Sequence, residues 1–239
     1  MKIKLTDPRE YPDWLINTLG ELKLLEEAIV NGKSFSEMAE GILSLDRLQL
    51  LLINFLPIVA SFPGYMSLIL KNIPAEEVEK NNLARFWLKE NIEIEQNHLD
   101  WYRDWAIGFG VPKSMIDKPK PPLPEVNEMH HFLLGICGNG SVAEALAGLN
   151  YAFEGPTGTW TRKVYRNINK YKKQGAVLNK KSKAWLAFHA RYDEFHPLEA
   201  LELIRVFAET KNEQEKVKSA AKIGMTYYAK VADTCYALV

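Results

Sequence analysis

The chain has 239 residues, of which 47% are hydrophobic and 25% charged, and its 30 basic side chains balance its 30 acidic ones. These proportions are typical of a globular protein with a large core, and the balanced charge argues against a nucleic-acid-binding protein. Two cysteines are too few for a disulfide framework and form no CxxC pair, which fits a reducing cytoplasm.

Neither a leader nor a membrane span is expected. The N-terminal residues MKIKLTDPREYPDW lack the apolar core of a signal peptide. The longest mostly apolar run, residues 50–60, is 11 residues long and contains Asn54 and Pro57, which is too short to cross a bilayer. We therefore expect a cytoplasmic protein with no membrane partner.

The first third of the chain shows helix signals. ELKLLEEAIV, residues 21–30, is amphipathic and precedes the stop signal Asn31-Gly32. SFSE, residues 34–37, has the capping-box pattern and predicts a short helix through Leu43. A third helix is expected from about residue 46 to residue 71.

Prolines and glycines mark the expected interruptions. Pro57 and Pro63-Gly64 predict a kink or break in the third helix. Residues 75–109 then predict one long helix that ends at Gly110. Residues 117–125, DKPKPPLPE, contain four prolines in nine positions and are interpreted as a loop inside one domain.

Helical patterns resume beyond that loop, and no short alternating strand with a hairpin turn occurs in the sequence. The chain is therefore predicted to form one all-α domain over residues 1–239, a bundle of seven or eight helices. The remaining helices are expected at about 124–136, 141–172, 179–209 and 212–238.

Polar residues that could bind a metal occur in three separate places. Glu95 and His98 form an E-x-x-H pair, and residues three apart on a helix point to the same side. On the helix expected at about 179–209, His189, Asp193 and His196 fall within a stripe of roughly 60°. Each cluster alone fits a solvated helix face better than a metal site.

A third piece is Glu154, a single carboxylate in LNYAFEGPTGTW, which alone could also be a helix-end residue. The combination favours a metal site, because bundle di-metal centres use single carboxylates on some helices and Glu-x-x-His pairs on others. Unpaired carboxylates in a helical core are costly, and mixed carboxylate and imidazole ligands suit iron or manganese.

The sequence resembles the heme-oxygenase-like superfamily of seven-helix proteins, which includes TenA-like and PqqC-like proteins. The similarity extends from about Trp14 to Val231. Its clearest blocks look most like those of the non-heme iron oxidases, in particular the bacterial alkene-forming fatty-acid decarboxylases. These blocks are residues 83–111, 149–160 and 184–204.

The resemblance implies a cofactor of one or two iron ions, with manganese as an alternative, and dioxygen as co-substrate. It implies oxidation of a small or medium-chain carboxylic acid, with decarboxylation of a fatty acid to a terminal alkene as one form. An external electron donor and a homodimer are also implied. The implied metal ligands are Glu95, His98, Glu154, His189, Asp193 and His196, of which Glu95, His98 and His189 are the implied catalytic residues.

One position departs from the decarboxylases. They carry a glutamate where this chain has Ala60, and no acidic residue occurs between Asp46 and Glu76. The number of metal ions and the identity of the substrate therefore stay open.

An apolar cavity is expected beside the metal, because a fatty chain needs one. Thr157 is a candidate for hydrogen bonding to a head group, although it is equally suited to bonding within its own helix. Phe62 and Trp160 are further candidates for the wall. The other predicted substrate-pocket residues are Tyr65, Tyr151, Phe153, Phe188 and Tyr192.

Of two alternatives within the superfamily, the residues argue against one and leave the other open. The thiaminase-like branch uses a cysteine near the block around Glu154, and residues 143–160 contain none. Cys137 is interpreted as a packing cysteine. A TenA-like or PqqC-like protein that binds a metal or ligand without oxidase turnover remains the alternative function.

Overall fold

The computed structural model describes residues 3–192 and 195–239, with the backbone alone for Tyr192, and these residues form no strand. The prediction of an all-α fold is confirmed for this part of the chain. The α-helices are α1 (Asp13–Asn31), α2 (Lys33–Glu40), α3 (Leu45–Asn72), α4 (Glu79–Gly108), α5 (Lys113–Asp117), α6 (Pro124–Asn139), α7 (Val142–Leu146), α8 (Ala152–Asn167), α9 (Ala184–Tyr192), α10 (His196–Phe207) and α11 (Lys211–Ala237).

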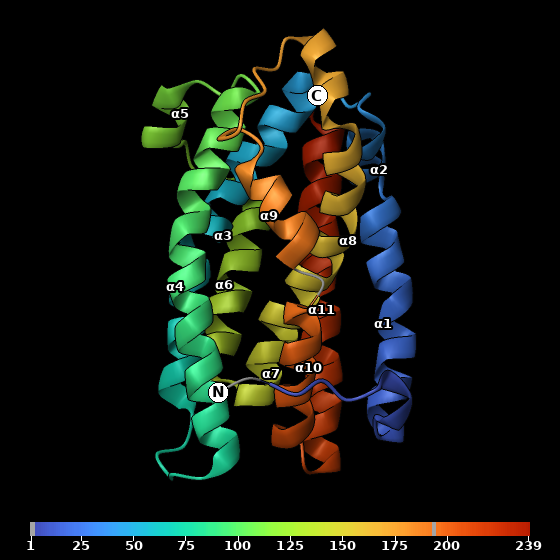
Figure 1. Ribbon diagram of the computed structural model, residues 1–239, viewed down its shortest axis with the longest axis vertical. Helices are drawn as coiled ribbons and strands as arrows, with labels where there is room; N and C mark the ends of the chain where they lie inside the picture. Colours follow the sequence, from blue (N-terminus) through green and yellow to red (C-terminus); the bar gives the residue numbers. More distant parts are fainter. Residues whose placement is uncertain (1–2, 193–194) are drawn as a thin grey trace.

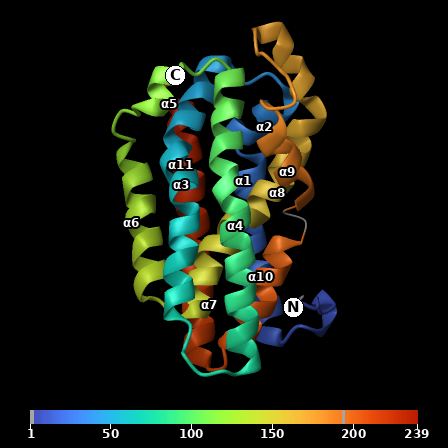
Figure 2. The ribbon, with the colours of Figure 1, turned by 60° about the vertical axis from the view of Figure 1, so that its left-hand side comes forward.

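The long helices run along the long axis of the molecule, with the two chain ends near opposite ends of the bundle (Figure 1). α3 packs between α4 and α6, as Figure 2 shows from the side. α11 contacts α1, α3 and α6, and α8 contacts α2 and α9. The core therefore lies between the α3–α4 pair and the helices α8, α9 and α11.

Two stretches predicted as continuous helices are divided in the structure. Residues 141–172 form α7, a π-helical segment η2 (Ala147–Tyr151), α8 and the start of a 3-10 segment η3 (Ile168–Gln174). Residues 179–209 contain α9 and α10 as separate helices. Pro197 lies in the first turn of α10, where the missing N–H and fixed φ of proline are tolerated, whereas a helix interior would lose a hydrogen bond there.

The predicted capping box at residues 34–37 is wrong. α2 begins two residues earlier than a helix capped by Ser34 would, with Gly32 as its N-cap and no side-chain cap. The hydroxyl of Ser34 instead donates to the carbonyl oxygen of Ala232 in α11 at 2.8 Å. A long-range contact therefore takes the hydroxyl that the local pattern assigned to capping.

Of the kink or break predicted at the prolines of the third helix, the break does not occur. α3 is one helix from Leu45 to Asn72 with Pro57 and Pro63 inside it. The hydroxyl of Ser67 donates to the carbonyl oxygen of Pro63 at 2.8 Å. Packing on both flanks, against α4 and α6, outweighs the cost of about 3 kcal/mol that a proline adds to a helix interior.

Because α3 continues through its prolines, it is longer than the 11-residue apolar run suggested. It is the one helix of the described residues that is long and apolar enough to cross a membrane by length and composition, with a mean hydropathy of 1.6 over 18 residues. Of that window, 44% is buried inside the bundle. A core helix of this kind passes the same test.

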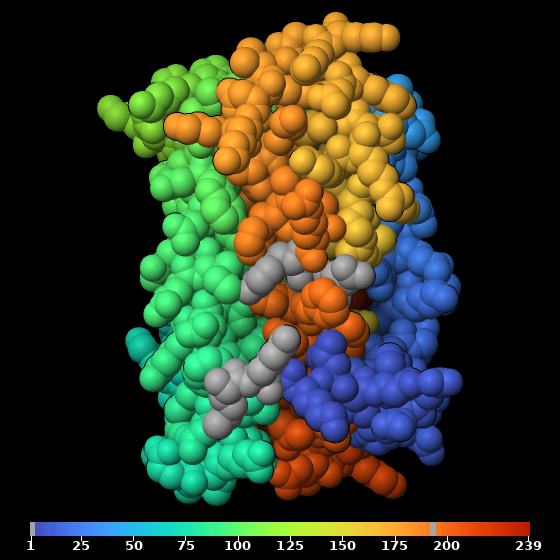
Figure 3. Space-filling model, viewed as in Figure 1, coloured from blue at the N-terminus to red at the C-terminus, as the bar shows by residue number. Residues whose placement is uncertain are grey.

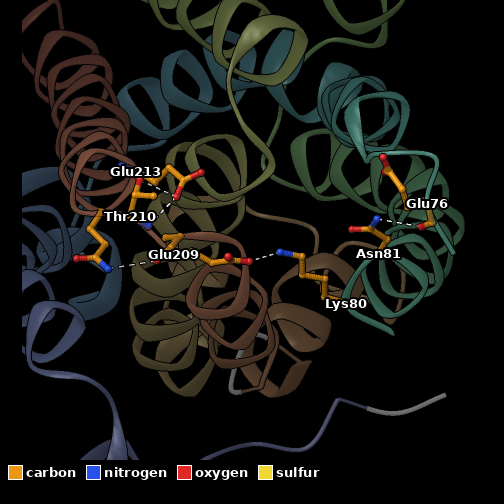
Figure 4. Close-up of polar contacts among 8 residues, drawn as sticks. Glu76, Lys80, Asn81, Glu209, Thr210 and Glu213 are labelled. Atoms are coloured by element: carbon orange, nitrogen blue, oxygen red, sulfur yellow. Dashed lines mark hydrogen bonds and ion pairs between the residues drawn. The ribbon is translucent and has the colours of Figure 1, made fainter. Parts of the chain in front are cut away.

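One end of the bundle is fixed by polar contacts between α4 and the start of α11 (Figure 4). Thr210 and Glu213 form a reciprocal capping box at the N-terminus of α11. Lys80 of α4 pairs with Glu209 just before that cap, and the Asn81 side chain donates to the carbonyl oxygen of Glu76. The Lys80–Glu209 pair holds the first turn of α4 against the loop between α10 and α11.

The N-terminal segment crosses the outer face of α10 (Figures 1 and 3). The backbone N–H and the hydroxyl of Thr6 donate to the two carboxylate oxygens of Glu202 at 2.7 and 3.1 Å. Glu202 also accepts from the Arg205 guanidinium at 2.8 Å. This strap holds α10, which begins with His196, against the body of the bundle.

Candidate metal centre

The first predicted ligand pair lies on the inner face of α4. Glu95 and His98 are only 7% and 1% exposed. Nδ1 of His98 lies 2.7 Å from Oε2 of Glu95, but the two atoms are not aligned as a hydrogen bond. The other ring nitrogen, Nε2, is buried and has no hydrogen-bond partner among the described residues. The pair therefore places a carboxylate oxygen and an imidazole nitrogen side by side in the interior.

The second pair joins α8 to α10. Oε2 of Glu154 lies 3.4 Å from Nδ1 of His196, and both side chains are buried. The amide of Asn150 donates to Oε1 of Glu154 at 2.9 Å and so orients the carboxylate. Asn150 belongs to the π-helical segment η2. Such segments occur frequently at functional sites.

His189 of α9 links the two pairs. Its ring centroid lies 4.8 Å from that of His98, and its side chain lines the same cavity as Glu95 and Glu154. The pKa of His189 is lowered to about 3, chiefly by burial and also by neighbouring His98, while Glu95 and Glu154 oppose the shift. The imidazole is therefore neutral near pH 7, the form that binds metals.

Asp193, the sixth predicted ligand, lies outside the described residues. The single-helix stripe on which it was predicted is wrong, because α9 ends at Tyr192 and α10 begins at His196. His189 and His196 are nevertheless both buried, and charge interactions with His98, Glu95, Glu154 and His196 all act on His189. Five of the six predicted ligands thus gather from α4, α8, α9 and α10.

The donor set fits a divalent transition metal in its chemistry. Three imidazoles and two carboxylates are buried together, and such a mixture suits iron or manganese. Oε2 of Glu154, like Nε2 of His98, has no hydrogen-bond partner within the described ranges. Across those ranges, however, no three His, Cys, Asp or Glu side chains already form a group with the geometry of a metal site. A bound ion would require these side chains to move closer together.

An apolar cavity of about 80 Å³ lies beside these donors. Glu95, Glu154 and His189 form part of its wall, and most of the remaining wall is aromatic or aliphatic. The other lining residues are Phe35, Leu51, Leu52, Phe55, Ile58, Val59, Phe62, Tyr102, Trp105, Phe153, Thr157, Trp160, Trp185 and Tyr228. The arrangement places a small apolar chamber against buried nitrogen and oxygen ligands.

Of the predicted pocket residues, Phe153 and Thr157 line the cavity, as do Phe62 and Trp160. Thr157 shares a hydrogen bond of 2.9 Å with the hydroxyl of Tyr228.

The remaining predicted pocket residues are placed elsewhere. Tyr65 lies one helical turn beyond Phe62, and its hydroxyl contacts Nδ1 of His130 at 2.5 Å. Phe188 packs edge-on against the ring of His98, behind the cavity wall. Tyr151 is not among the residues that line the cavity, and the side chain of Tyr192 lies outside the described part of the chain.

The sequence contained a signal for some of the wall residues that were missed. Tyr102 and Trp105 follow His98 at helical spacing and share the inward stripe of α4. Trp185 precedes His189 by one turn of α9. No local signal points to Phe35 or Tyr228, which reach the cavity from α2 and α11.

α3 adds no carboxylate to the cavity. Its lining side chains are all apolar, and Ala60 is exposed on another face of the helix. No other side chain of α3 therefore supplies the carboxylate that Ala60 lacks. The carboxylates of the cavity wall come from α4 and α8.

Neither cysteine reaches the cavity. Cys137 lies on α6 and Cys235 on α11, both fully buried and outside the wall. Burial raises the pKa of each thiol to about 12. A thiol with such a high pKa is a poor nucleophile, so the arrangement gives no support to a cysteine-dependent thiaminase reaction.

The fold is similar to that of several solved structures. A TenA homologue from Pseudomonas syringae pv. tomato is 26% identical with a TM-score of 0.89, and each chain covers 100% of the other. A TenA homologue from Pyrococcus furiosus is 16% identical with a TM-score of 0.72, covering 93% of this chain and 99% of that one. A domain with a heme oxygenase-like fold from Shewanella denitrificans is 14% identical with a TM-score of 0.70, covering 93% and 92%.

No curated protein sequence matches the chain. A family model described as "iron-containing redox enzyme" matches residues 49–229. That range includes all five described candidate ligands and most of the cavity wall. The chain, which has a heme-oxygenase-like fold, belongs to this family of iron-containing redox enzymes.

Proposed function

We propose that this protein is a non-heme iron oxidase that uses dioxygen to oxidise a small carboxylic acid. The observation that carries the proposal is that Glu95, Glu154 and His189, all buried, line one apolar cavity. Two further buried imidazoles lie directly behind this wall, His98 beside Glu95 and His196 beside Glu154. Membership of an iron-containing redox enzyme family supports it. Without a cation, the buried carboxylates Glu95 and Glu154 would be costly to keep ionised.

The residues proposed to hold iron are Glu95, His98, Glu154, His189 and His196, with Asp193 as a sixth. Bound iron would supply the redox chemistry with dioxygen, with manganese as an alternative metal. Asn150 orients the Glu154 carboxylate by its hydrogen bond. The low pKa of His189 keeps its imidazole neutral and able to bind metal. The apolar wall keeps water away from the substrate.

The size of the cavity favours a small acid over a long one. A cavity of about 80 Å³ has room for roughly five to eight atoms of the size of water. Hexanoic acid matches this volume better than dodecanoic acid does. In the decarboxylation form of the reaction, the acid loses carbon dioxide and two electrons and becomes a terminal alkene. An external donor gives two further electrons, and one dioxygen becomes two waters.

The experiment begins with protein loaded with iron(II) in the absence of oxygen. Metal per chain is counted, and air is then admitted in the presence of butanoic, hexanoic, octanoic or dodecanoic acid and a reductant. Dioxygen consumption and alkene in the headspace are measured. We expect bound iron and acid-dependent dioxygen uptake that is strongest for a short acid.

The matched variants are His98→Gln and His131→Gln. His98 is buried beside the cavity, whereas His131 is exposed on α6. Iron content and dioxygen uptake should fall in the first variant and be unchanged in the second. Iron bound equally well by both variants would refute the proposed ligands, and iron-loaded protein that consumes no dioxygen with any acid would refute the oxidase.

A second candidate is a protein that binds a small ligand in this cavity without turnover. The observation in its favour is that the described donors do not already form a complete three-ligand metal group. In that case a short acid would bind to metal-free protein, and iron(II) would change neither the affinity nor the rate of dioxygen consumption.

A further inference from the structure

Two hydrogen-bond donors in the cavity wall have no protein partner. The indole N–H groups of Trp105 and Trp185 are buried and unpaired within the described part of the chain. The two side chains are only 1% and 6% exposed, and both line the cavity. By contrast, the indole of Trp160 donates to the Tyr228 hydroxyl at 2.9 Å, and that of Trp87 donates to Glu199 at 2.8 Å.

The rings that carry the two unpaired donors lie together in the cavity wall, beside one of the proposed iron ligands. The rings of Trp105 on α4 and Trp185 on α9 stack at 4.9 Å between centroids, with 12° between their planes. The ring of Trp185 also lies 4.0 Å from that of His189. The stacked pair of indoles therefore borders a proposed iron ligand through the ring of Trp185.

The chemistry of an indole restricts what its partner can be. The indole nitrogen is a donor only, and a buried donor without a partner is unfavourable. The cavity is the space beside both rings that protein atoms do not fill. The occupant should therefore bring an acceptor atom. An ammonium head group would suit Glu95 and Glu154 but would leave both indoles unpaired.

We propose that Trp105 and Trp185 form a subsite that holds the carbonyl oxygen of the substrate's head group. The proposal rests on the proposed function only in taking this cavity as the substrate site. A carboxylate, a carboxylic acid and a carboxamide all share the required oxygen, and a carboxylate offers one oxygen to each indole. The two tryptophans thereby determine specificity and set the position of the head group beside His189.

The test is nuclear magnetic resonance of the indole N–H signals in the 15N-labelled full-length chain, purified without added metal. Hexanamide, hexanoate and hexylamine are titrated separately. The Trp105 and Trp185 signals should move downfield with hexanamide, and less with hexanoate, whose negative charge Glu95 and Glu154 repel. Hexylamine should not produce the shift. The Trp160 signal is the internal control, because its N–H already has a partner.

Variants give an independent measurement of the same contacts. Trp105→Phe and Trp185→Phe each remove the N–H and keep an aromatic ring, and each should weaken hexanamide binding by about fivefold to tenfold, the worth of one neutral hydrogen bond. Trp14→Phe makes the same chemical change at a half-buried side chain of α1 that lies outside the cavity wall, and it should leave hexanamide binding unchanged.

The outcomes separate this subsite from the oxidase. Indole signals that move with none of the three probes, or that move equally with hexylamine, would overturn the subsite, as would unchanged affinity in both cavity variants. Because no iron is added, failure here leaves the iron count and the dioxygen measurement unaffected. Conversely, if hexanamide shifts the two indole signals in a chain that never binds iron, the subsite is supported and the oxidase is refuted.

Discussion

α11 approaches η2 so closely at Gly224 that there is no room for a side chain. A Cβ at this position would lie 2.6 Å from the carbonyl oxygen of Gly148 and 2.9 Å from Cβ of Ala152. Normal contact would require about 0.8 Å more separation from that oxygen, taking an ordinary Cβ contact of 3.4 Å. The obstructing atoms are backbone and a short side chain, so they cannot rotate away.

Gly224→Ala is therefore expected to destabilise the protein. Overpacking of this kind costs about 1–3 kcal/mol, and replacing a helical glycine by alanine returns up to about 1 kcal/mol. The net loss should be about 1–2 kcal/mol. For a chain of this size each kcal/mol corresponds to about 2–4 °C, so we expect the Tm to fall by roughly 2–8 °C in calorimetry.

The same substitution should reach the metal centre. Displacing η2 from α11 moves Asn150 and the start of α8, which carries Glu154. Iron content should therefore fall together with stability. Gly135→Ala in α6 is the matched control, because nothing lies within 4 Å of its added Cβ. The reasoning is refuted if Gly224→Ala melts at or above the wild-type temperature.

Three further outcomes are expected. His98→Ala should weaken iron(II) binding at least about tenfold, since even the loss of outer-shell partners costs 10–100-fold; equilibrium dialysis measures it, and unchanged affinity contradicts the ligand assignment. Thr210→Ala removes the capping box of α11 and should cost about 1 kcal/mol in urea unfolding, with Thr210→Ser close to wild type. Cys137 and Cys235 should resist thiol reagents at pH 8 until denaturant is added, because burial raises each pKa to about 12. Since the unfolded thiols ionise near pH 9 and the folded ones do not, the contribution of the protonated thiols to stability is complete below pH 9 and is lost as the pH rises towards 12. Rapid labelling of either cysteine in the native state would contradict their burial.

Much of the local structure followed from sequence patterns. The stop signal at Asn31-Gly32 ends α1, and the long helix predicted for residues 75–109 corresponds to α4. Errors arose where distant contacts or packing outweighed a local rule. Ser34 bonds to α11 instead of capping α2, and α3 continues through Pro57 and Pro63 because it is packed on both flanks. Pro197 indicates the α9–α10 boundary in the sequence, and the prediction of one helix over residues 179–209 did not take it into account.

The sequence by itself determined the all-α fold and the inward Glu95–His98 pair, because residues three apart on any helix face the same way. Only the tertiary structure decided that polar residues of α4, α8 and α9 line one cavity, with His196 of α10 beside Glu154. It also decided that two indoles in that wall lack partners among the described residues. Periodicity fixes which side chains share a face of one helix. Which faces meet depends on packing among helices far apart in the chain, and that information is not contained in any local pattern.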